Sequence, residues 1–143
     1  MPDKPEAQKR ETLLALLQEE QEKNGCISEQ FIAQAAESMG ITVNEVYGVA
    51  TFYSFLSTSA LARNVIRVCK SVPCYFSNSQ SVVDALQEEL GILPGETTPD
   101  GKFSLLLTNC IGACDQAPAM LLNNELHGNL TRDKIAKLLK ACL

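Results

Sequence analysis

Four of the six cysteines in this 143-residue chain stand in two pairs, which constrain its structure more than any other feature. Cys69 and Cys74 enclose four residues, and Cys110 and Cys114 enclose three.

The opening residues lack the apolar core of a signal peptide, and no apolar stretch approaches the roughly 20 residues that cross a bilayer. We therefore expect a cytoplasmic chain. Because cytosolic thiols are kept reduced, metal binding is the leading explanation of the pairs.

Each cysteine pair follows a predicted strand. Residues 64–68 are a short β-branched run that ends at Cys69, and the apolar run 103–108 leads directly to Cys110. Loops that leave strand ends can be rigidly positioned by the sheet behind them. Two such loops could face each other and supply four thiolates.

Spacing and loop composition leave three interpretations of these thiols open. Structural zinc sites use ligand pairs two to four residues apart, and four-residue spacing also occurs among iron–sulfur ligands. Disulfide exchange is the third interpretation, but it normally uses a C-x-x-C pair, which is absent. Gly112, Ala113 and Ser71 are small residues that leave backbone N–H groups free for sulfide ligands. The loops therefore favour a [2Fe-2S] cluster, with a zinc-stabilised interaction module as the alternative.

The remaining cysteines and the single histidine have no ligand pattern around them. Cys26 lies near a predicted helix start and Cys142 on the apolar face of the last predicted helix. We interpret both as buried free thiols and expect them to be dispensable for metal binding. His127, beside Gly128 in a predicted hairpin, is interpreted as a surface or structural residue.

The first 60 residues predict a small helical bundle. Helices are expected over residues 7–23, from an N-cap at Ser28 to a stop at Gly40, and from residue 43 to about residue 56. Thr42 and Glu45 have the spacing of a capping box that opens the third helix. The third helix also carries aromatic residues whose expected role is core or interhelix packing: Tyr47, Phe52, Tyr53 and Phe55.

From residue 61 the pattern becomes α/β. A helix beginning at Ser79 or Ser81 and ending at Gly91 follows the first strand, and residues 96–98 are expected to pair with 103–108 across Asp100-Gly101. Residues 120–122 and 125–127 predict a hairpin, and Thr131 can cap a final helix. We therefore predict an α+β chain with a helical bundle over 1–60 and a cysteine-bearing domain over 61–143.

The charge of the chain is unevenly distributed. The formal net charge is −5, and residues 1–60 hold 9 acidic and 4 basic residues while the rest holds 8 of each. An acidic chain without a Lys/Arg stripe offers nucleic acid little to bind, because phosphate contacts dominate such binding. The N-terminal acidity is interpreted as a solvated helix face, with a partner-docking surface as the alternative.

Several motifs together resemble the 24 kDa-type [2Fe-2S] subunit family of NADH dehydrogenase and of NAD(P)-linked and electron-bifurcating hydrogenases and formate dehydrogenases. The resemblance covers nearly the whole chain and includes the Cys69 and Cys74 pair. The other matching segments are VYGVATFY (46–53), LGI (90–92), GETT (95–98), DGKFSL (100–105), CIGAC (110–114) and AP (117–118).

The resemblance implies a helical bundle followed by a thioredoxin-like ferredoxin domain. It makes Cys69, Cys74, Cys110 and Cys114 the ligands of one [2Fe-2S] cluster. It also implies a partner flavoprotein subunit that binds FMN and NAD(P)(H), together with further iron–sulfur subunits. The chain itself has no dinucleotide-binding motif, so we expect a non-catalytic subunit that exchanges single electrons.

The parent complex is predicted from the end of the chain. The sequence stops soon after its last predicted helix, without the longer tail of some respiratory members of the family. This favours a soluble hydrogenase or formate dehydrogenase complex, with respiratory NADH dehydrogenase as the alternative.

Overall fold

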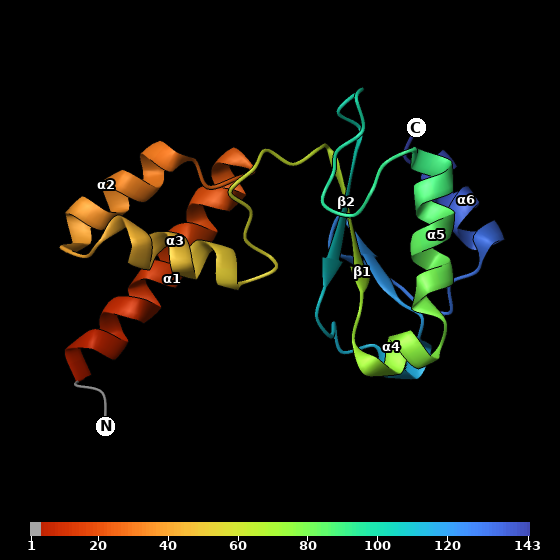
Figure 1. The fold of residues 1–143 in the computed structure, drawn as a ribbon, viewed down its shortest axis with the longest axis horizontal. Helices are drawn as coiled ribbons and strands as arrows, with labels where there is room; N and C mark the ends of the chain where they lie inside the picture. The colour runs from red at the N-terminus through yellow and green to blue at the C-terminus, as the bar shows by residue number, and fades with distance from the viewer. Residues whose placement is uncertain (1–3) are drawn as a thin grey trace. The chain divides into compact units, whose positions relative to one another are not determined.

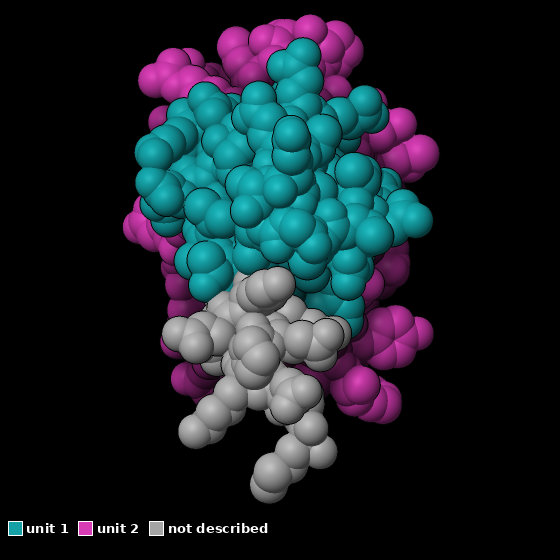
Figure 2. Space-filling view, turned by 90° about the vertical axis from the view of Figure 1, so that its left-hand side faces the viewer, with its two compact units in different colours: residues 1–60 teal, residues 61–143 magenta. Residues whose placement is uncertain are grey.

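The computed structural model describes the backbone of residues 4–143 and the side chains from Thr12 onward. Residues 1–3 belong to the N-terminal segment that we do not expect to be a signal peptide, and they lie outside the described residues. The chain divides into two compact units, Met1–Ala60 and Leu61–Leu143 (Figure 2). None of the helices described is long and apolar enough to cross a membrane.

The first unit contains three helices, α1 (Lys4–Asn24), α2 (Glu29–Met39) and α3 (Val43–Phe52) (Figure 1). The predicted starts of α2 and α3 are confirmed. The Ser28 hydroxyl accepts a hydrogen bond from the backbone N–H of Phe31 at 3.2 Å, and Thr42 forms a complete capping box with Glu45. Helix α3 ends at Phe52, before the predicted end near residue 56.

Small and branched apolar side chains form the core of the first unit, and the aromatic residues expected in the third helix do not. On α3 the buried residues are Val46 and Ala50, one helical turn apart. Among the side chains of this unit that the structure describes, those buried in its core are Leu13, Leu17, Ile27, Ile32, Ala35, Ala36, Val46 and Ala50. The expectation that the aromatic side chains pack inward is wrong. All four are exposed: Tyr47, Phe52, Tyr53 and Phe55.

The segment after α3 is held to α1 by hydrogen bonds of the Gln21 side chain. The side-chain amide of Gln21 donates a hydrogen bond to the carbonyl of Phe55, and its oxygen accepts one from the backbone N–H of Ser57. The N–H of Ile27 donates to the Ser57 carbonyl at 2.8 Å. These bonds fix the direction in which the chain leaves α3 and hold Phe55 in the first unit.

The second unit is a four-stranded sheet with helices on one face (Figure 1). Its strands are β1 (Asn64–Cys69), β2 (Phe103–Thr108), β3 (Met120–Leu122) and β4 (Glu125–His127), in the order β2-β1-β3-β4. Strands β1 and β2 are parallel and the other pairs are antiparallel. The connection from β1 to β2 runs through α5 (Ser79–Leu90), and α6 (Arg132–Ala141) packs beside α5.

Alternation along the strands directs one set of side chains to these helices. Ile66 and Val68 of β1, Leu105 of β2 and Met120 of β3 are fully buried in one core with Leu86 of α5. A parallel pair needs a crossover connection, and α5 supplies it while covering the core. The sheet is therefore a firm base for the loops that leave β1 and β2.

Most predicted elements of the second unit are confirmed, with two differences. Helix α5 begins at Ser79, as predicted, after Asn78, which has a positive φ and makes no side-chain cap. Residues 96–98 form no strand, only an isolated antiparallel bridge between Thr97 and Ser104. A short helix that was not predicted, α4 (Val72–Phe76), follows β1 and has Pro73 in its first turn, where proline costs no hydrogen bond.

Candidate metal centre

The first cysteine pair is carried by β1 and α4. Cys69 is the last residue of β1 and its backbone N–H donates to the Ala119 carbonyl at 3.2 Å. Lys70 continues the ladder with a 2.9 Å bond to the Thr108 carbonyl. Cys74 lies within α4, and both thiols of the pair are buried. The position of this pair is therefore set by the sheet and by one helical turn.

The second pair belongs to a tight loop after β2. The sulfur atoms of Cys110 and Cys114 lie 3.4 Å apart, and the backbone N–H of Gly112 points at the Cys110 sulfur at 3.4 Å. Gly112 has a φ of 78°, a left-handed conformation that favours glycine. Both thiols are exposed, in contrast to the first pair.

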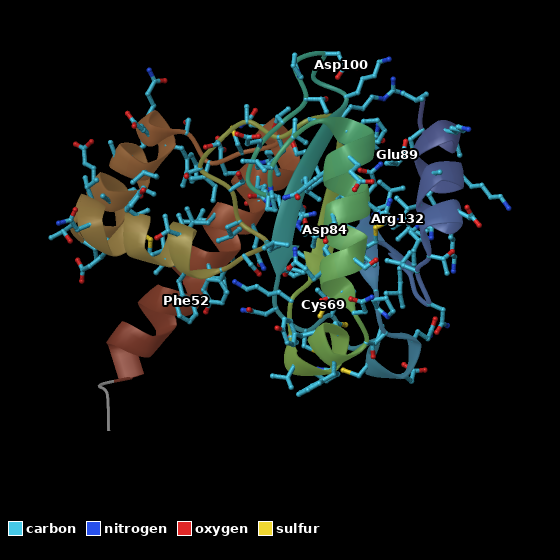
Figure 3. All side chains as sticks on the ribbon, turned by 45° about the vertical axis from the view of Figure 1, so that its right-hand side comes forward. Phe52, Cys69, Asp84, Glu89, Asp100 and Arg132 are labelled. Atoms are coloured by element: carbon cyan, nitrogen blue, oxygen red, sulfur yellow. The ribbon has the colours of Figure 1, made fainter. Side chains whose placement is uncertain are left out.

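The parallel pairing of β1 and β2 brings the two loops to the same edge of the sheet. Cys69 is in register with Thr108, so both loops leave the sheet at the same level. Figure 3 shows Cys69 beside α4, at the end of β1. The backbone N–H of Ile111, from the second loop, lies close enough to the Cys69 sulfur to lower the pKa of that thiol. The structure thus brings all four predicted residues to one end of the second unit.

The ionisation of the thiols shows that the pairs influence each other. Burial opposes ionisation of Cys69, but hydrogen bonds from Ser71, Cys74 and Ile111 outweigh it and lower its pKa. Burial raises the pKa of Cys74, helped by its hydrogen bond to Cys69 and by the charge of Cys114. The side-chain hydrogen bond with Cys110 raises the pKa of Cys114, and the Cys69 charge adds to this.

This arrangement fits a binuclear cluster. A tetrahedral metal with sulfur ligands at about 2.3 Å holds two of them roughly 3.8 Å apart, close to the separation of Cys110 and Cys114. Within the described part of the chain, no three His, Cys, Asp or Glu side chains form a group that could hold one ion. A [2Fe-2S] cluster takes four thiolates over two irons, and the two thiol pairs supply that number.

The other candidate residues lie outside this site. All six cysteines are free, and Cys26 and Cys142 are partly buried, less so than predicted. His127 lies in β4, and its Nε2 atom is buried without a hydrogen-bond partner among the described residues. Its place in the sheet fits the predicted structural role.

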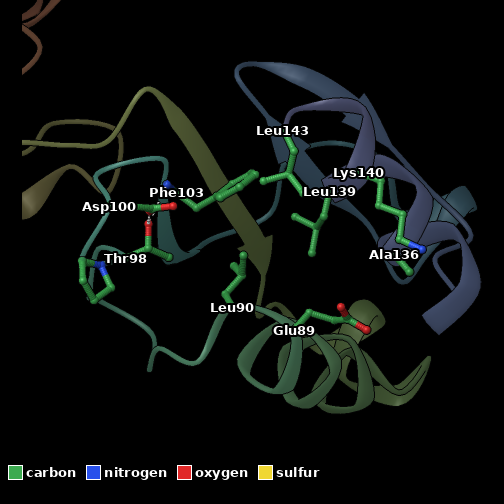
Figure 4. A pocket seen from close by; sticks show the side chains of 10 residues that line it. Glu89, Leu90, Thr98, Asp100, Phe103, Ala136, Leu139, Lys140 and Leu143 are labelled. Carbon is green, nitrogen blue, oxygen red and sulfur yellow. Dashed lines mark hydrogen bonds between the residues drawn. The ribbon is translucent and has the colours of Figure 1, made fainter.

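A pocket of about 380 Å³ opens elsewhere in the second unit (Figure 4). Leu90, Phe103 and Leu139 form its apolar lining, and Glu89 and Lys140 are among its polar residues. No cysteine lines it. The candidate metal centre is therefore assigned from the thiol geometry and not from this pocket.

Comparison with known proteins decides the family. The family model for thioredoxin-like [2Fe-2S] ferredoxins matches residues 2–143. The chain belongs to this family. The resemblance inferred from the motifs is thereby confirmed, as are the α+β fold class with its thioredoxin-like part and the [2Fe-2S] cofactor. The family match does not itself name the ligands, which rest on the geometry above.

Two curated proteins and one solved structure illustrate the family. An NADH-quinone oxidoreductase subunit of Pseudomonas aeruginosa is 43% identical over 121 residues, covering 85% of this chain and 73% of that protein. The corresponding protein of Escherichia coli (strain K12) is 41% identical over 120 residues, covering 84% and 72%. An NAD+-reducing [NiFe]-hydrogenase in the H2-reduced state is 26% identical with a TM-score of 0.73. That match covers 89% of this ferredoxin-family chain but only 22% of the hydrogenase chain.

Part of the site was accessible from the sequence and part was not. The cysteine spacing and the strands before each pair predicted the two loops. Helix α4 and the approach of the Ile111 N–H to the Cys69 sulfur were missed. The only sequence signal for α4 was Ser71 followed by Pro73, a weak helix start.

Proposed function

We propose that this chain is a one-electron carrier that holds its [2Fe-2S] cluster on Cys69, Cys74, Cys110 and Cys114. The observation that carries the proposal is the meeting of two free thiol pairs at one edge of the sheet, with the Cys110 and Cys114 sulfurs 3.4 Å apart. Ligation by four thiolates without histidine favours a low-potential centre of the ferredoxin kind and disfavours a Rieske centre.

The chain's own residues would hold the cluster and stabilise its charge. Bound there, the cluster supplies reversible one-electron chemistry. The backbone N–H of Gly112 reaches the Cys110 sulfur, and those of Ser71 and Ile111 lie near enough to Cys69 to lower its pKa. Such donors favour a more negative cluster. The stiff base of β1 and β2 limits rearrangement of the ligands, which keeps the cost of electron transfer small.

The electron partner is a flavoprotein subunit that binds FMN and NAD(P)(H), in a complex with further iron–sulfur subunits. A flavin takes a hydride as two electrons, and a nearby iron–sulfur centre accepts them singly. For the parent complex, a soluble hydrogenase or formate dehydrogenase was predicted from the sequence. The names of the curated relatives fit the respiratory alternative. Identifying the proteins that copurify with the tagged chain distinguishes these complexes.

Assembly into that complex is assigned to the first unit. Its exposed aromatic residues include Phe52, which is 78% exposed and in edge-to-face contact with Tyr53 at 5.0 Å. Exposed aromatic side chains of this kind are typical anchors of protein interfaces. We expect Phe52→Ser to reduce copurification of the flavoprotein and to leave the cluster spectrum unchanged. Full copurification of the variant would refute this role.

Single Cys→Ser substitutions test the ligand assignment. Cys110→Ser and Cys74→Ser should lose most of the visible absorption and the reduced-state paramagnetic signal. Cys26→Ser and Cys142→Ser are matched controls and should retain both. Loss in Cys26→Ser with retention in Cys110→Ser would overturn the assignment, and zinc without iron in the purified protein would favour the interaction-module alternative.

Adding NADH anaerobically tests the role as a relay. The isolated chain should stay oxidised with NADH alone and should be reduced once the flavoprotein subunit is supplied, with flavin content checked in each sample. Rapid reduction of flavin-free protein by NADH alone would mean that the chain has a nucleotide site of its own.

A further inference from the structure

Helix α4 exposes a cluster of large apolar side chains beside the metal centre. Val72 and Tyr75 are each 66% exposed and Phe76 is 83% exposed. The rings of Tyr75 and Phe76 are in edge-to-face contact, with centroids 6.2 Å apart and planes at 76°. We call these three residues the α4 patch. Contiguous exposed apolar patches of a few hundred Å² are often functional.

The α4 patch and the ligand Cys74 share one short helix. Cys74 is buried, while its neighbours Tyr75 and Phe76 face outward. The backbone N–H of Tyr75 donates to the Ser71 carbonyl at 2.9 Å, and that of Ser77 donates to the Pro73 carbonyl at 3.1 Å. The patch is therefore held at a fixed place beside the first cysteine pair.

Charged residues are absent from the sequence segments that carry the α4 patch and most of the cysteine loops. Residues 71–83 and 103–114 contain no Asp, Glu, Lys or Arg, and Lys70 and Asp115 border them. A partner that docks here would desolvate no charged side chain of these segments, whose burial without a partner is costly. The docking surface of that partner should accordingly be apolar and weakly charged.

The size of the patch indicates which occupant it fits. At about 150–250 Å² per aromatic side chain, Tyr75 and Phe76 expose roughly 300 Å². A stable dimer needs about 800 Å² from each copy, whereas electron-transfer encounters bury less than about 1,200 Å² in total. The patch supplies about half of the area that one partner buries in such an encounter. It is well below the area that each copy buries in a stable dimer.

We propose that the α4 patch is the surface on which the flavin-bearing redox partner docks for electron transfer. This inference rests on the proposed function. In the step concerned, the partner's flavin is oxidised by one electron and the cluster is reduced by that electron, with no proton taken up by this chain. The patch sets the rate of that step, while the exposed aromatic surface of the first unit serves attachment.

The test compares a double variant with a matched control. Tyr75→Ser with Phe76→Ser removes the patch without touching a ligand. Leu143→Ser is the control, because Leu143 is 76% exposed and Figure 1 places the C-terminus at the far end of α5 from α4. Stopped-flow absorbance follows cluster reduction by the NADH-reduced flavoprotein subunit of the native complex, and separately by photoreduced free FMN. The cluster potential is measured for each protein.

The double variant should be reduced at least about tenfold more slowly by the flavoprotein, because aromatic residues carry much of the binding energy of interfaces. Its rate with free FMN and its potential should equal those of the wild type, as should all values for Leu143→Ser. An unchanged rate with the flavoprotein overturns the inference, and so does equal slowing with free FMN. A wild-type dimer that the double variant dissociates would assign the patch to self-association. If the wild type is not reduced by the flavoprotein at all, the proposed function fails.

Discussion

Gly112 offers the sharpest test of the loop that holds the second cysteine pair. Its φ of 78° lies in the left-handed region, and a Cβ built there would meet no atom within 4 Å. Gly112→Ala therefore introduces no clash. Its cost is confined to the backbone, where a non-glycine residue in this conformation costs about 1–2 kcal/mol.

This conformational cost destabilises the state of the loop, with or without the cluster, that requires the left-handed conformation. The bound cluster fixes Cys110 and Cys114, whereas the cluster-free loop can relax to another backbone conformation. The substitution should therefore weaken cluster retention by a factor of roughly 5–30, since about 1.4 kcal/mol is tenfold. Gly112→Asn is the matched control, because asparagine tolerates the left-handed region better than alanine. Cluster retention in Gly112→Asn should therefore fall distinctly less than in Gly112→Ala.

The assay is competition for iron. Reconstituted wild type, Gly112→Ala and Gly112→Asn are incubated anaerobically with a graded concentration of an iron chelator, and the remaining visible absorption is measured. The expected order of retention is wild type, then Gly112→Asn, then Gly112→Ala. Equal retention by all three proteins would show that the loop does not need this conformation when the cluster is bound, and the reasoning from φ would be refuted.

Three further predictions concern stability. Leu86→Ala removes a fully buried side chain from the core of the second unit and should lower the free energy of unfolding by about 2–5 kcal/mol in urea denaturation. Thr42→Ala removes the capping box with Glu45 and should cost about 1 kcal/mol, with Thr42→Ser close to wild type by the same assay. The hydrogen bond from Thr98 and that from the Lys102 N–H lower the pKa of Asp100. The Asp100 carboxylate therefore stabilises the fold at pH values above the ordinary carboxyl pKa of about 3.9. This stabilisation is lost as the pH falls through the lowered pKa of the folded state. Acid unfolding of Asp100→Asn should lack this part of the pH dependence.

The elements that could be predicted are those whose signals are local. Ser28 and Thr42 act as helix caps because their hydroxyls satisfy N–H groups three residues away, a relation that is visible in the sequence. The strands before Cys69 and Cys110 are recognisable by their apolar runs. The spacing of the cysteines likewise restricts the chemistry before any contact is known.

The features that could not be predicted depend on partners distant in sequence. The strand expected at residues 96–98 is reduced to the single bridge of Thr97 with Ser104. This segment lies beside β2, the edge strand of the sheet, and how far it pairs with β2 depends on contacts that its own sequence does not show. The approach of the Ile111 N–H to the Cys69 sulfur relates the two cysteine loops. It follows from the parallel register of β1 and β2, which the sequence does not state.

The wrong prediction for the aromatic residues of α3 has a physical cause that bears on function. Apolar side chains occur on more than one side of α3, so its sequence pattern alone does not show which side faces the core. Val46 and Ala50 are small enough for close helix packing, and the structure buries them while Tyr47 and Phe52 stay exposed. Exposing large aromatic surface to water is unfavourable by roughly 25 cal/mol per Å². Burying it against another protein would recover that energy, so the same residues that the core does not use are the strongest reason to assign attachment to the first unit.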